Sequence, residues 1–157
     1  MTACITEYGI NPSKFKNIGK EPYEENESKI IRAGDIVLNR SGQSGVATIF
    51  PEDMDGVMAC GFSFVLRLKK SYDPYYVAAF LNSRLGRLQT ERFAFGSILD
   101  HITKEDLRSI LIPFPKDKKI MNNISEGFKK VVDHQMSARI GFNEFFRSYD
   151  QKLLEGE

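Results

Sequence analysis

The sequence contains no tryptophan, two cysteines and two histidines, and its 22 Lys and Arg residues nearly balance its 21 Asp and Glu residues. The net charge of +1 gives no overall attraction to nucleic acid, although a local cluster of basic residues can still bind phosphates. Cys4 and Cys60 make no metal-ligand spacing with His101 or His134. The sequence therefore predicts no metal site.

Long apolar runs are also missing. No stretch approaches the roughly 20 residues of a membrane span. The opening residues, Met1–Glu7, lack the basic and then apolar order of a secretory signal. We therefore expect a cytoplasmic protein with both thiols reduced, and we expect Cys60, inside an apolar run, in the core. The length of 157 residues allows one domain and an appendage.

Residues 1–115 have the pattern of a small β-rich domain with short helices. Asp73 and Pro74 predict a helix start, since Asp can cap the first turn and Pro suits the first helical position. Gly86 could divide this helix, and Thr103 with Asp106 predicts a capping box before a short helical turn. Short strands are expected at 30–31, 35–40, 45–50 and 109–112, and residues 57–68 are expected to form a longer strand or a bulged pair around Gly61.

The segment Ile110–Pro115 leads into one long helix, predicted from about Lys116 to Leu154. Apolar residues there recur at alternating spacings of three and four, which is the heptad pattern of a coiled coil. The fold class is thus α+β, with a head at 1–115 and a helical arm at 116–157. The expected pairing residues are Ile124, Phe128, Val131, Gln135, Phe142, Phe145 and Tyr149.

The arm is expected to pair with another helix. At about 1.5 Å per residue it would span about 58 Å, which is longer than a small domain is wide. The alternative is that the arm folds back and completes the core of the head. Gln135, a polar residue in the apolar seam, could fix the register, and Gly127 and Gly141 could permit close helix approach.

Catalytic motifs are weak. Asp73-Pro74-Tyr75-Tyr76 is similar to the base-holding motif of amino-methyltransferases, but the chain has no glycine-rich turn for a methyl donor. Glu27-Ser28-Lys29 has the spacing of metal-dependent nucleases, without a partner acid on an adjacent strand, and is better explained as surface charge. None of these motifs identifies a catalytic centre, and the sequence indicates no cofactor.

Two loops could approach a nucleic acid. Arg40-Ser41-Gly42-Gln43-Ser44-Gly45 joins two expected strands and concentrates long donors and hydroxyl groups on a glycine-permitted turn. Arg and Gln are suited to reading guanine and adenine. A plain surface hairpin accounts for these residues equally well. The second loop, Phe93–His101, could instead be a linker whose Ile98 and Leu99 fill the core.

Four motifs in order resemble the target recognition domain of a type I restriction–modification specificity subunit. The first is Ile31–Val37, with Gly34-Asp35, leading to Arg40-Ser41-Gly42. The other three are Tyr76–Ser83, then Gly96-Ser97 before Ile102-Thr103, and Leu107–Pro115 before the long helix. The resemblance covers roughly residues 28–135.

This resemblance implies a non-catalytic subunit that reads double-stranded DNA and pairs through its helix, either as a homodimer or with a second recognition unit. It also implies a methyltransferase subunit docked on the scaffold, which a translocating restriction subunit can join. On this basis the expected DNA-binding residues are Lys14, Lys16, Arg40, Ser41, Gln43, Ser44, Arg92, Ser97 and His101.

The chain departs from the family pattern in three ways. It carries one recognition unit where two are usual, it is expected to lack much of the family's opening segment, and Lys116-Asp117-Lys118-Lys119 replaces the usual Glu-Gln. A half-subunit that dimerises, or a fragment, would explain the first difference. Two alternatives remain open: an interaction scaffold that binds no DNA, and a recognition domain detached from a single-chain restriction–methylation enzyme.

Overall fold

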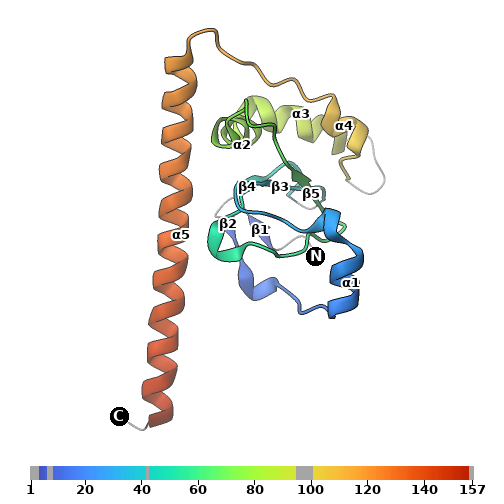
Figure 1. Ribbon diagram of the computed structural model, residues 1–157. Coiled ribbons are helices and arrows are strands. Elements are labelled where there is room, and N and C mark those ends of the chain that lie inside the picture. The colour runs from blue at the N-terminus through green and yellow to red at the C-terminus, as the bar shows by residue number, and fades with distance from the viewer. Residues whose placement is uncertain (1–3, 7–8, 42, 95–100, 156–157) are drawn as a thin grey trace.

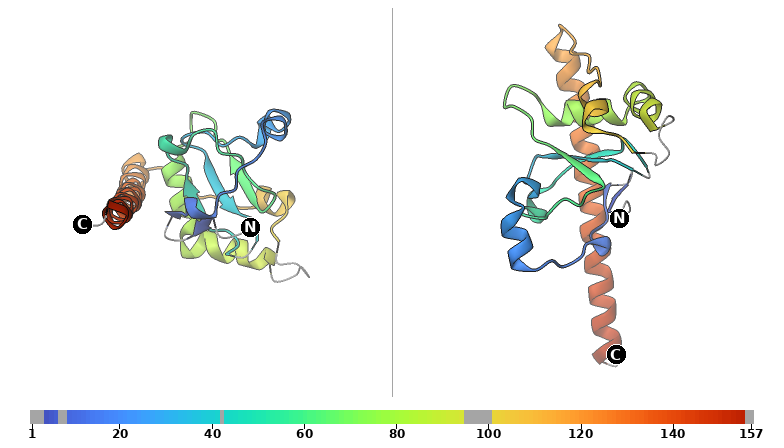
Figure 2. Two further views of the ribbon diagram at one scale, coloured as in Figure 1. Left: turned by 90° about the horizontal axis from the view of Figure 1, so that it is seen from below. Right: turned by 90° about the vertical axis from the view of Figure 1, so that its right-hand side faces the viewer.

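The computed structural model describes residues 4–6, 9–41, 43–94 and 101–155. It has the expected α+β fold, a β-rich head beside one long carboxyl-terminal helix, α5 (Lys118–Glu155) (Figure 1). Seen from below, α5 lies to one side of the head (Figure 2). The prediction of a long terminal helix is confirmed.

A three-stranded antiparallel sheet forms the centre of the head. Its middle strand, β3 (Ile36–Asn39), pairs with β4 (Ala47–Ile49) on one side and with β5 (Ser63–Leu66) on the other. Successive side chains of a strand point to opposite faces, so Ile36 and Leu38 enter one apolar cluster and Val37 enters the other. The two faces of this small sheet therefore hold two halves of the core.

The amino-terminal part of the head adds a second, smaller sheet. Its strands β1 (Ile5–Thr6) and β2 (Gly9–Ile10) pair antiparallel. The helix α1 (Lys20–Glu25) follows. Short 3₁₀ turns lie at Pro12–Lys14, Glu27–Lys29 and Glu52–Met54.

Two helices, α2 (Pro74–Asn82) and α3 (Arg84–Ala94), cover one face of the sheet. The predicted cap of α2 is confirmed, because Asp73 Oδ1 accepts hydrogen bonds from the amides of Tyr75 at 2.8 Å and Tyr76 at 3.2 Å. The division between the two helices falls at Ser83. Gly86 follows it, and a Cβ there would lie 2.2 Å from the Phe80 carbonyl oxygen. This glycine lets α3 pack closely on the end of α2.

The predicted capping box is also confirmed, at the start of α4 (Lys104–Arg108). The amide of Asp106 donates to Thr103 Oγ1 at 3.1 Å, and the amide of Thr103 donates to Asp106 Oδ2 at 2.9 Å. The hydrogen bonds from the Thr103 hydroxyl and amide lower the pKa of Asp106 below its usual value.

The outer edge of β4 is closed by a side chain. Asn82, the last residue of α2, accepts from the Ala47 amide at 3.2 Å and donates to the Ala47 carbonyl at 2.7 Å. Its amide nitrogen also donates to the Ala78 carbonyl, 2.9 Å away. One side-chain amide thus takes the place that a neighbouring strand would occupy.

Some strand predictions were wrong. Residues 30–31 make only the isolated bridge Ile30–Met58, and in the expected strand at 57–68 only Ser63–Leu66 is regular. Residues 109–112 form no strand, because they run along α2 and α3 where no strand lies beside them. The amide of Leu111 instead donates to Oε1 of Gln89, 2.9 Å away.

The prediction for Cys60 was wrong as well. Its side chain is exposed, because the chain turns between Cys60 and Ser63 just before β5, and the Ser63 amide donates to the Cys60 carbonyl at 3.1 Å. The turn carries Cys60 out of the core that its apolar neighbours enter.

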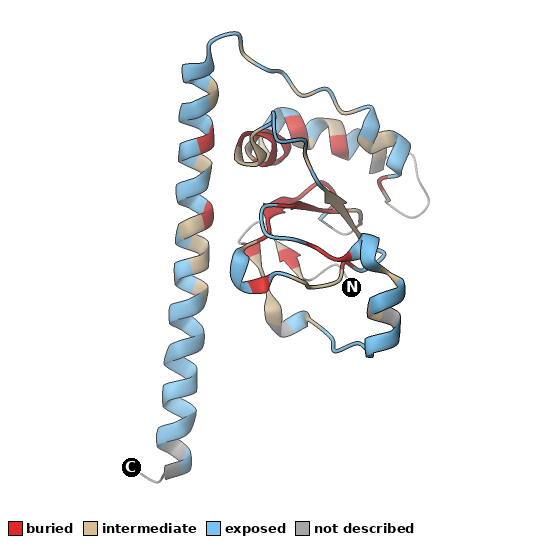
Figure 3. Ribbon diagram, viewed as in Figure 1, coloured by how far each residue is buried: buried red, intermediate tan, exposed pale blue. Residues whose placement is uncertain are grey.

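The first part of α5 packs against the head (Figure 3). We call residues 118–139 the proximal half and residues 140–155 the distal half. In the proximal half Val132 and Ser125 are buried, and the Ser125 hydroxyl donates to Asp73 Oδ2 at 2.6 Å. Arg139 donates to Asp53 Oδ2 at 2.7 Å. The proximal half of the arm therefore completes the head. From the sequence, this arrangement was the alternative to the expected pairing with another helix.

Candidate nucleic-acid interface

The loop between β3 and β4 contains the first group of predicted DNA-binding residues. It is a tight hairpin connection, in which the Gly45 amide donates to the Asn39 carbonyl at 2.9 Å. Gly45 has φ +83, and a Cβ at that position would lie 2.2 Å from Thr90 Oγ1. The glycine thus supplies a left-handed turn and lets the loop pack directly on α3.

Arg40 connects this loop to the segment at His101. The Arg40 carbonyl accepts from the Ile102 amide at 2.9 Å, and Arg40 Nε donates to the Ile102 carbonyl at 3.1 Å. The guanidinium carbon lies 5.9 Å from the centre of the Phe64 ring, within cation–π range. Two segments that are 62 residues apart in the sequence are therefore held side by side through one arginine.

The guanidinium of Arg40 is fixed at one end. Its Nε is used by Ile102, while its two terminal nitrogens have no hydrogen-bond partner among the described residues. The residue is half-buried. This arrangement holds the side chain in place and leaves a planar fork of donors for a ligand.

The three other predicted residues of the loop differ in exposure. Gln43 is exposed, whereas Ser41 and Ser44 are buried. The Ser44 hydroxyl donates to the Arg40 carbonyl at 3.3 Å. The Ser44 hydroxyl is thus used within the turn, and of the three residues only Gln43 is exposed.

His101 lies on the same side of the head as Arg40. Its neighbour Ile102 is fully buried and anchors the segment in the core. The His101 ring centre lies 6.3 Å from that of Phe62, which is itself 42% exposed. His101 Nδ1 is buried without a hydrogen-bond partner among the described residues. Phe62 was missed by the sequence reasoning, which assigned residues 57–68 to a strand and gave its side chain no role.

The remaining predicted DNA-binding residues do not join this group. Arg92 is exposed near the end of α3, with its guanidinium carbon 5.0 Å from the Phe93 ring centre. Ser97 lies outside the described residues. Lys14 and Lys16 are exposed and line a separate apolar cavity of about 620 Å³ between the amino-terminal segment and the sheet.

Both cysteines line that same cavity. Burial raises the pKa of the Cys4 thiol, and the nearby Cys60 raises it further. The Cys4 thiol donates to the Lys14 carbonyl at 3.5 Å. Cys4 is thus tied to the amino-terminal segment and is less ionised than an ordinary cysteine at neutral pH.

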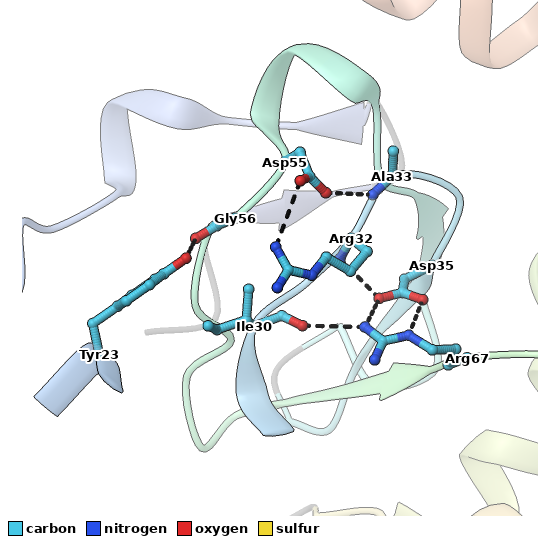
Figure 4. A network of polar contacts seen from close by, with 8 residues as sticks. All are labelled: Tyr23, Ile30, Arg32, Ala33, Asp35, Asp55, Gly56 and Arg67. Atoms are coloured by element: carbon cyan, nitrogen blue, oxygen red, sulfur yellow. Dashed lines mark hydrogen bonds and ion pairs between the residues drawn. The ribbon is translucent and has the colours of Figure 1, made fainter. Parts of the chain in front are cut away.

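The Gly34-Asp35 motif has a structural role (Figure 4). Asp35 is 4% exposed and accepts from the amide of Arg32 at 2.8 Å and from Nε of Arg67 at 2.9 Å. The hydrogen bond to Asp35 raises the pKa of Arg67. Arg67 also donates to the Ile30 carbonyl at 3.2 Å. The motif therefore locks the turn before β3 and positions the strand that leads to Arg40.

A second carboxylate holds the other side of this turn. Asp55 Oδ1 accepts from the Ala33 amide at 2.9 Å, and its Oδ2 lies 3.6 Å from a terminal nitrogen of Arg32. Gly34, at the turn itself, has φ +82, a conformation that favours glycine. Tyr23 of α1 donates to the carbonyl of Gly56, the residue after Asp55, at 2.8 Å.

The predicted pairing residues of α5 fall into two groups. Phe128 packs against the core, and Gln135 lies against Gly9, where a Cβ would come within 3.2 Å of Gln135 Oε1. The other five are exposed: Ile124, Val131, Phe142, Phe145 and Tyr149. At Gly127 and Gly141 an added Cβ would meet no atom within 4 Å, so packing within the chain does not require a glycine at either place.

Comparison of the chain with protein-family models and with curated proteins found no match to either. Over the described ranges, no three His, Cys, Asp or Glu side chains are grouped as they would be around a metal ion. Within the same ranges no helix has the length and apolar character needed to cross a membrane.

Proposed function

We propose that this chain reads double-stranded DNA as half of the specificity subunit of a type I restriction–modification system. In this proposal it is non-catalytic, pairs through α5, and forms a scaffold for methyltransferase subunits, which a translocating restriction subunit can join. The observation that carries the proposal is the junction of the two predicted loops at Arg40 and Ile102. It holds the guanidinium of Arg40 beside the residue that follows His101, and Gln43 is exposed in the same loop as Arg40.

The roles of these residues follow from their exposure. Arg40 and Gln43 would read base edges in the major groove, and His101 and Arg92 would contact the same duplex from the adjacent segments. Ser41 and Ser44 would act by holding the turn. Lys14 and Lys16 would hold phosphates, which adds affinity without sequence preference.

Selection from a random pool of duplexes, with the methyltransferase subunit present, tests this proposal. We expect an enriched motif, and Arg40→Ala should flatten the preference among duplexes by about 1–3 kcal/mol at one position. Arg147→Ala on the distal half removes the same charge and should leave the motif unchanged. If Arg40→Ala weakens binding to every duplex equally, Arg40 is a phosphate contact and its proposed role is wrong.

Salt dependence separates DNA recognition from the scaffold alternative. Counterion release makes the logarithm of the binding constant fall linearly with the logarithm of salt concentration, with a slope set by the phosphates contacted. We expect such a slope for duplex DNA. If the chain associates with protein partners but does not bind duplex DNA at low salt, the result supports the interaction scaffold and contradicts DNA recognition.

The pairing surface proposed for α5 is a stripe next to the face that packs on the head. At 3.6 residues per turn, the exposed proximal residues fall on one side of the helix, in line with the exposed distal aromatic residues. The members of this outer stripe are Ile120, Ile124, Gly127, Val131, Phe142, Phe145 and Tyr149.

An antiparallel pair matches large residues with small ones. Each bulky distal side chain would then lie against a smaller proximal residue of the second copy. The opposing pairs would be Phe142 with Gly127, Phe145 with Ile124 and Tyr149 with Ile120. A parallel pair in register would place aromatic residues against their own copies and glycine against glycine. Size complementarity thus favours the antiparallel arrangement.

Disulfide crosslinking distinguishes the two orientations. In a background with Cys4→Ser and Cys60→Ser, a mixture of Ile120→Cys and Tyr149→Cys chains should form the mixed crosslink in an antiparallel pair. A parallel pair should instead crosslink Tyr149→Cys chains to one another. If the chain does not self-associate, the homodimer is wrong. That result would not contradict the DNA-recognition part of the proposal.

A further inference from the structure

A cavity of about 290 Å³ lies where the proximal half of α5 meets the head. Its walls belong to several elements, namely β2, β4, the junction of α2 and α3, and one side of α5. Residues that line it include Gly9, Thr48, Asn82, Arg87, Val131 and Gln135. A group bound here would touch the head and the arm at once.

Arg87 places a poorly neutralised cation in this cavity. Its Nη1 is buried and has no hydrogen-bond partner among the described residues. The carboxylate paired with it is that of Glu91, whose Oε1 is 3.9 Å from Nε and whose side chain is half exposed. An arginine remains charged at all relevant pH values and carries five donors. A buried donor of this kind is normally satisfied by a partner.

The described lining residues offer Arg87 no counter-charge, because none of them is acidic. The amide of Asn82 is also already committed, since it bonds to both Ala47 and Ala78. The cavity therefore has a positive charge, neutral polar walls and no acceptor of matching strength among those residues. Guanidinium groups bind phosphate and carboxylate through short, charge-assisted hydrogen bonds.

We propose that this cavity is an oxyanion site, with Arg87 as its principal ligand and a phosphate group as the preferred occupant. A volume of about 290 Å³ admits such a group together with several waters, each of which takes about 30 Å³ in the liquid. Binding would fasten the arm to the head, because both contribute walls. The proposal does not depend on DNA reading.

The test is thermal unfolding of the full chain in sodium phosphate and in sodium chloride at equal ionic strength. At phosphate concentrations about ten times the dissociation constant, the wild-type Tm should rise by about 3 °C more than in chloride, and the rise should saturate. Arg87→Gln should lose the saturable part. Arg84→Gln, which removes an exposed charge from the same helix, should keep it.

Two results would overturn the proposal. One is a wild-type response equal to that of Arg87→Gln, which is the general effect of phosphate on protein surfaces. The other is a saturable response that appears only in Glu91→Gln, which would mean that the chain's own carboxylate already neutralises Arg87. Circular dichroism of Arg87→Gln checks that the variant is folded, so a missing response cannot be attributed to misfolding.

The phosphate can come from solution or from a DNA backbone, and a duplex-binding assay separates the two sources. If Arg87→Gln lowers duplex affinity and phosphate competes with wild-type binding, the site takes a backbone phosphate. If duplex affinity is unchanged in Arg87→Gln while the Tm response is lost, the site takes free phosphate.

Discussion

The proximal and distal halves of α5 carry the same apolar repeat but bury it differently. In the proximal half Val132 is 8% exposed and Phe128 packs against the core of the head. In the distal half Phe142 and Phe145 are 64% and 63% exposed. The aromatic rings there contact each other, with centres 4.6 Å apart for Phe142 and Phe146. A heptad repeat thus identifies residues that need burial without identifying what covers them.

The largest expected effect comes from the distal aromatic residues. Phe142→Ser combined with Phe145→Ser should weaken self-association by at least about 100-fold, or about 3 kcal/mol, since interface energy is concentrated in a few large side chains. Sedimentation equilibrium measures this change. Asn143→Ser, on the opposite side of the same turn, is the control. An unchanged association constant in the double variant would mean that another surface pairs the chains.

The same substitution in the two halves should change stability differently. Phe128→Ala should lower the free energy of unfolding by about 2–3 kcal/mol, because it removes a ring packed on the core. Phe145→Ala, measured under monomeric conditions, should change it by less than about 0.5 kcal/mol. Urea denaturation gives both values. Equal losses would show that the distal half is also packed within the chain, and the contrast between the halves would disappear.

A smaller effect is expected at the hydrogen bond that joins the proximal half to α2. Ser125→Ala should cost about 1 kcal/mol, because Asp73 Oδ2, accepting at 2.6 Å, loses its donor in a partly buried place. Ser137→Ala, whose exposed hydroxyl donates to the Asp133 carbonyl of its own helix at 2.9 Å, should be near neutral. Urea denaturation of both variants measures the difference in the free energy of unfolding. Equal effects would mean that this hydrogen bond does not stabilise the packing of α5 on the head.

The smallest effect concerns the two glycines, one in each half. Both positions are open within the chain. Gly127→Ala and Gly141→Ala should each raise the intrinsic stability of the helix by up to about 1 kcal/mol. For Gly127→Ala the gain should appear in the free energy of unfolding measured with urea, because the proximal half unfolds together with the head. For Gly141→Ala it should appear only in the helical circular dichroism signal, because the distal half does not pack on the head. If the Gly127→Ala, Gly141→Ala double variant self-associates as the wild type does, the hypothesis that these glycines permit close helix approach is wrong.

Local rules were sufficient for much of the fold. The cap at Asp73 and the box at Thr103 depend on residues within one turn, and both were predicted correctly. The same holds for the hairpin between β3 and β4 and for the long helix. In each case the information lies in neighbouring residues, so no tertiary knowledge was needed.

The errors arose where a distant partner decides the structure. Residues 109–112 have strand-like composition, but helices α2 and α3 lie beside them, and Gln89 takes the hydrogen bonds that a strand would supply. Cys60 sits among apolar residues, yet a turn sets its direction. The sequence could not reveal that the proximal half of α5 would pack on the head, since that depends on Ser125 meeting Asp73 and on Val132 meeting the apolar core.

The candidate site shows the same division. The loop containing Arg40 and Gln43 was predicted from composition, but the burial of Ser41 and Ser44 and the packing of Gly45 on Thr90 of α3 were not. Phe62 and the buried Nδ1 of His101 have no local sequence signal. They belong to the surface only because Arg40 binds both neighbouring segments, through the Phe62 carbonyl and through Ile102.

The side chain of Asn82 has a consequence for how this protein avoids aggregation. An exposed sheet edge is a template on which a strand from another molecule can add, and small sheets have two such edges. At Ala47 the template is already filled, because the Asn82 amide occupies both its donor and its acceptor. A strand from another molecule therefore finds neither a free donor nor a free acceptor at Ala47 of β4.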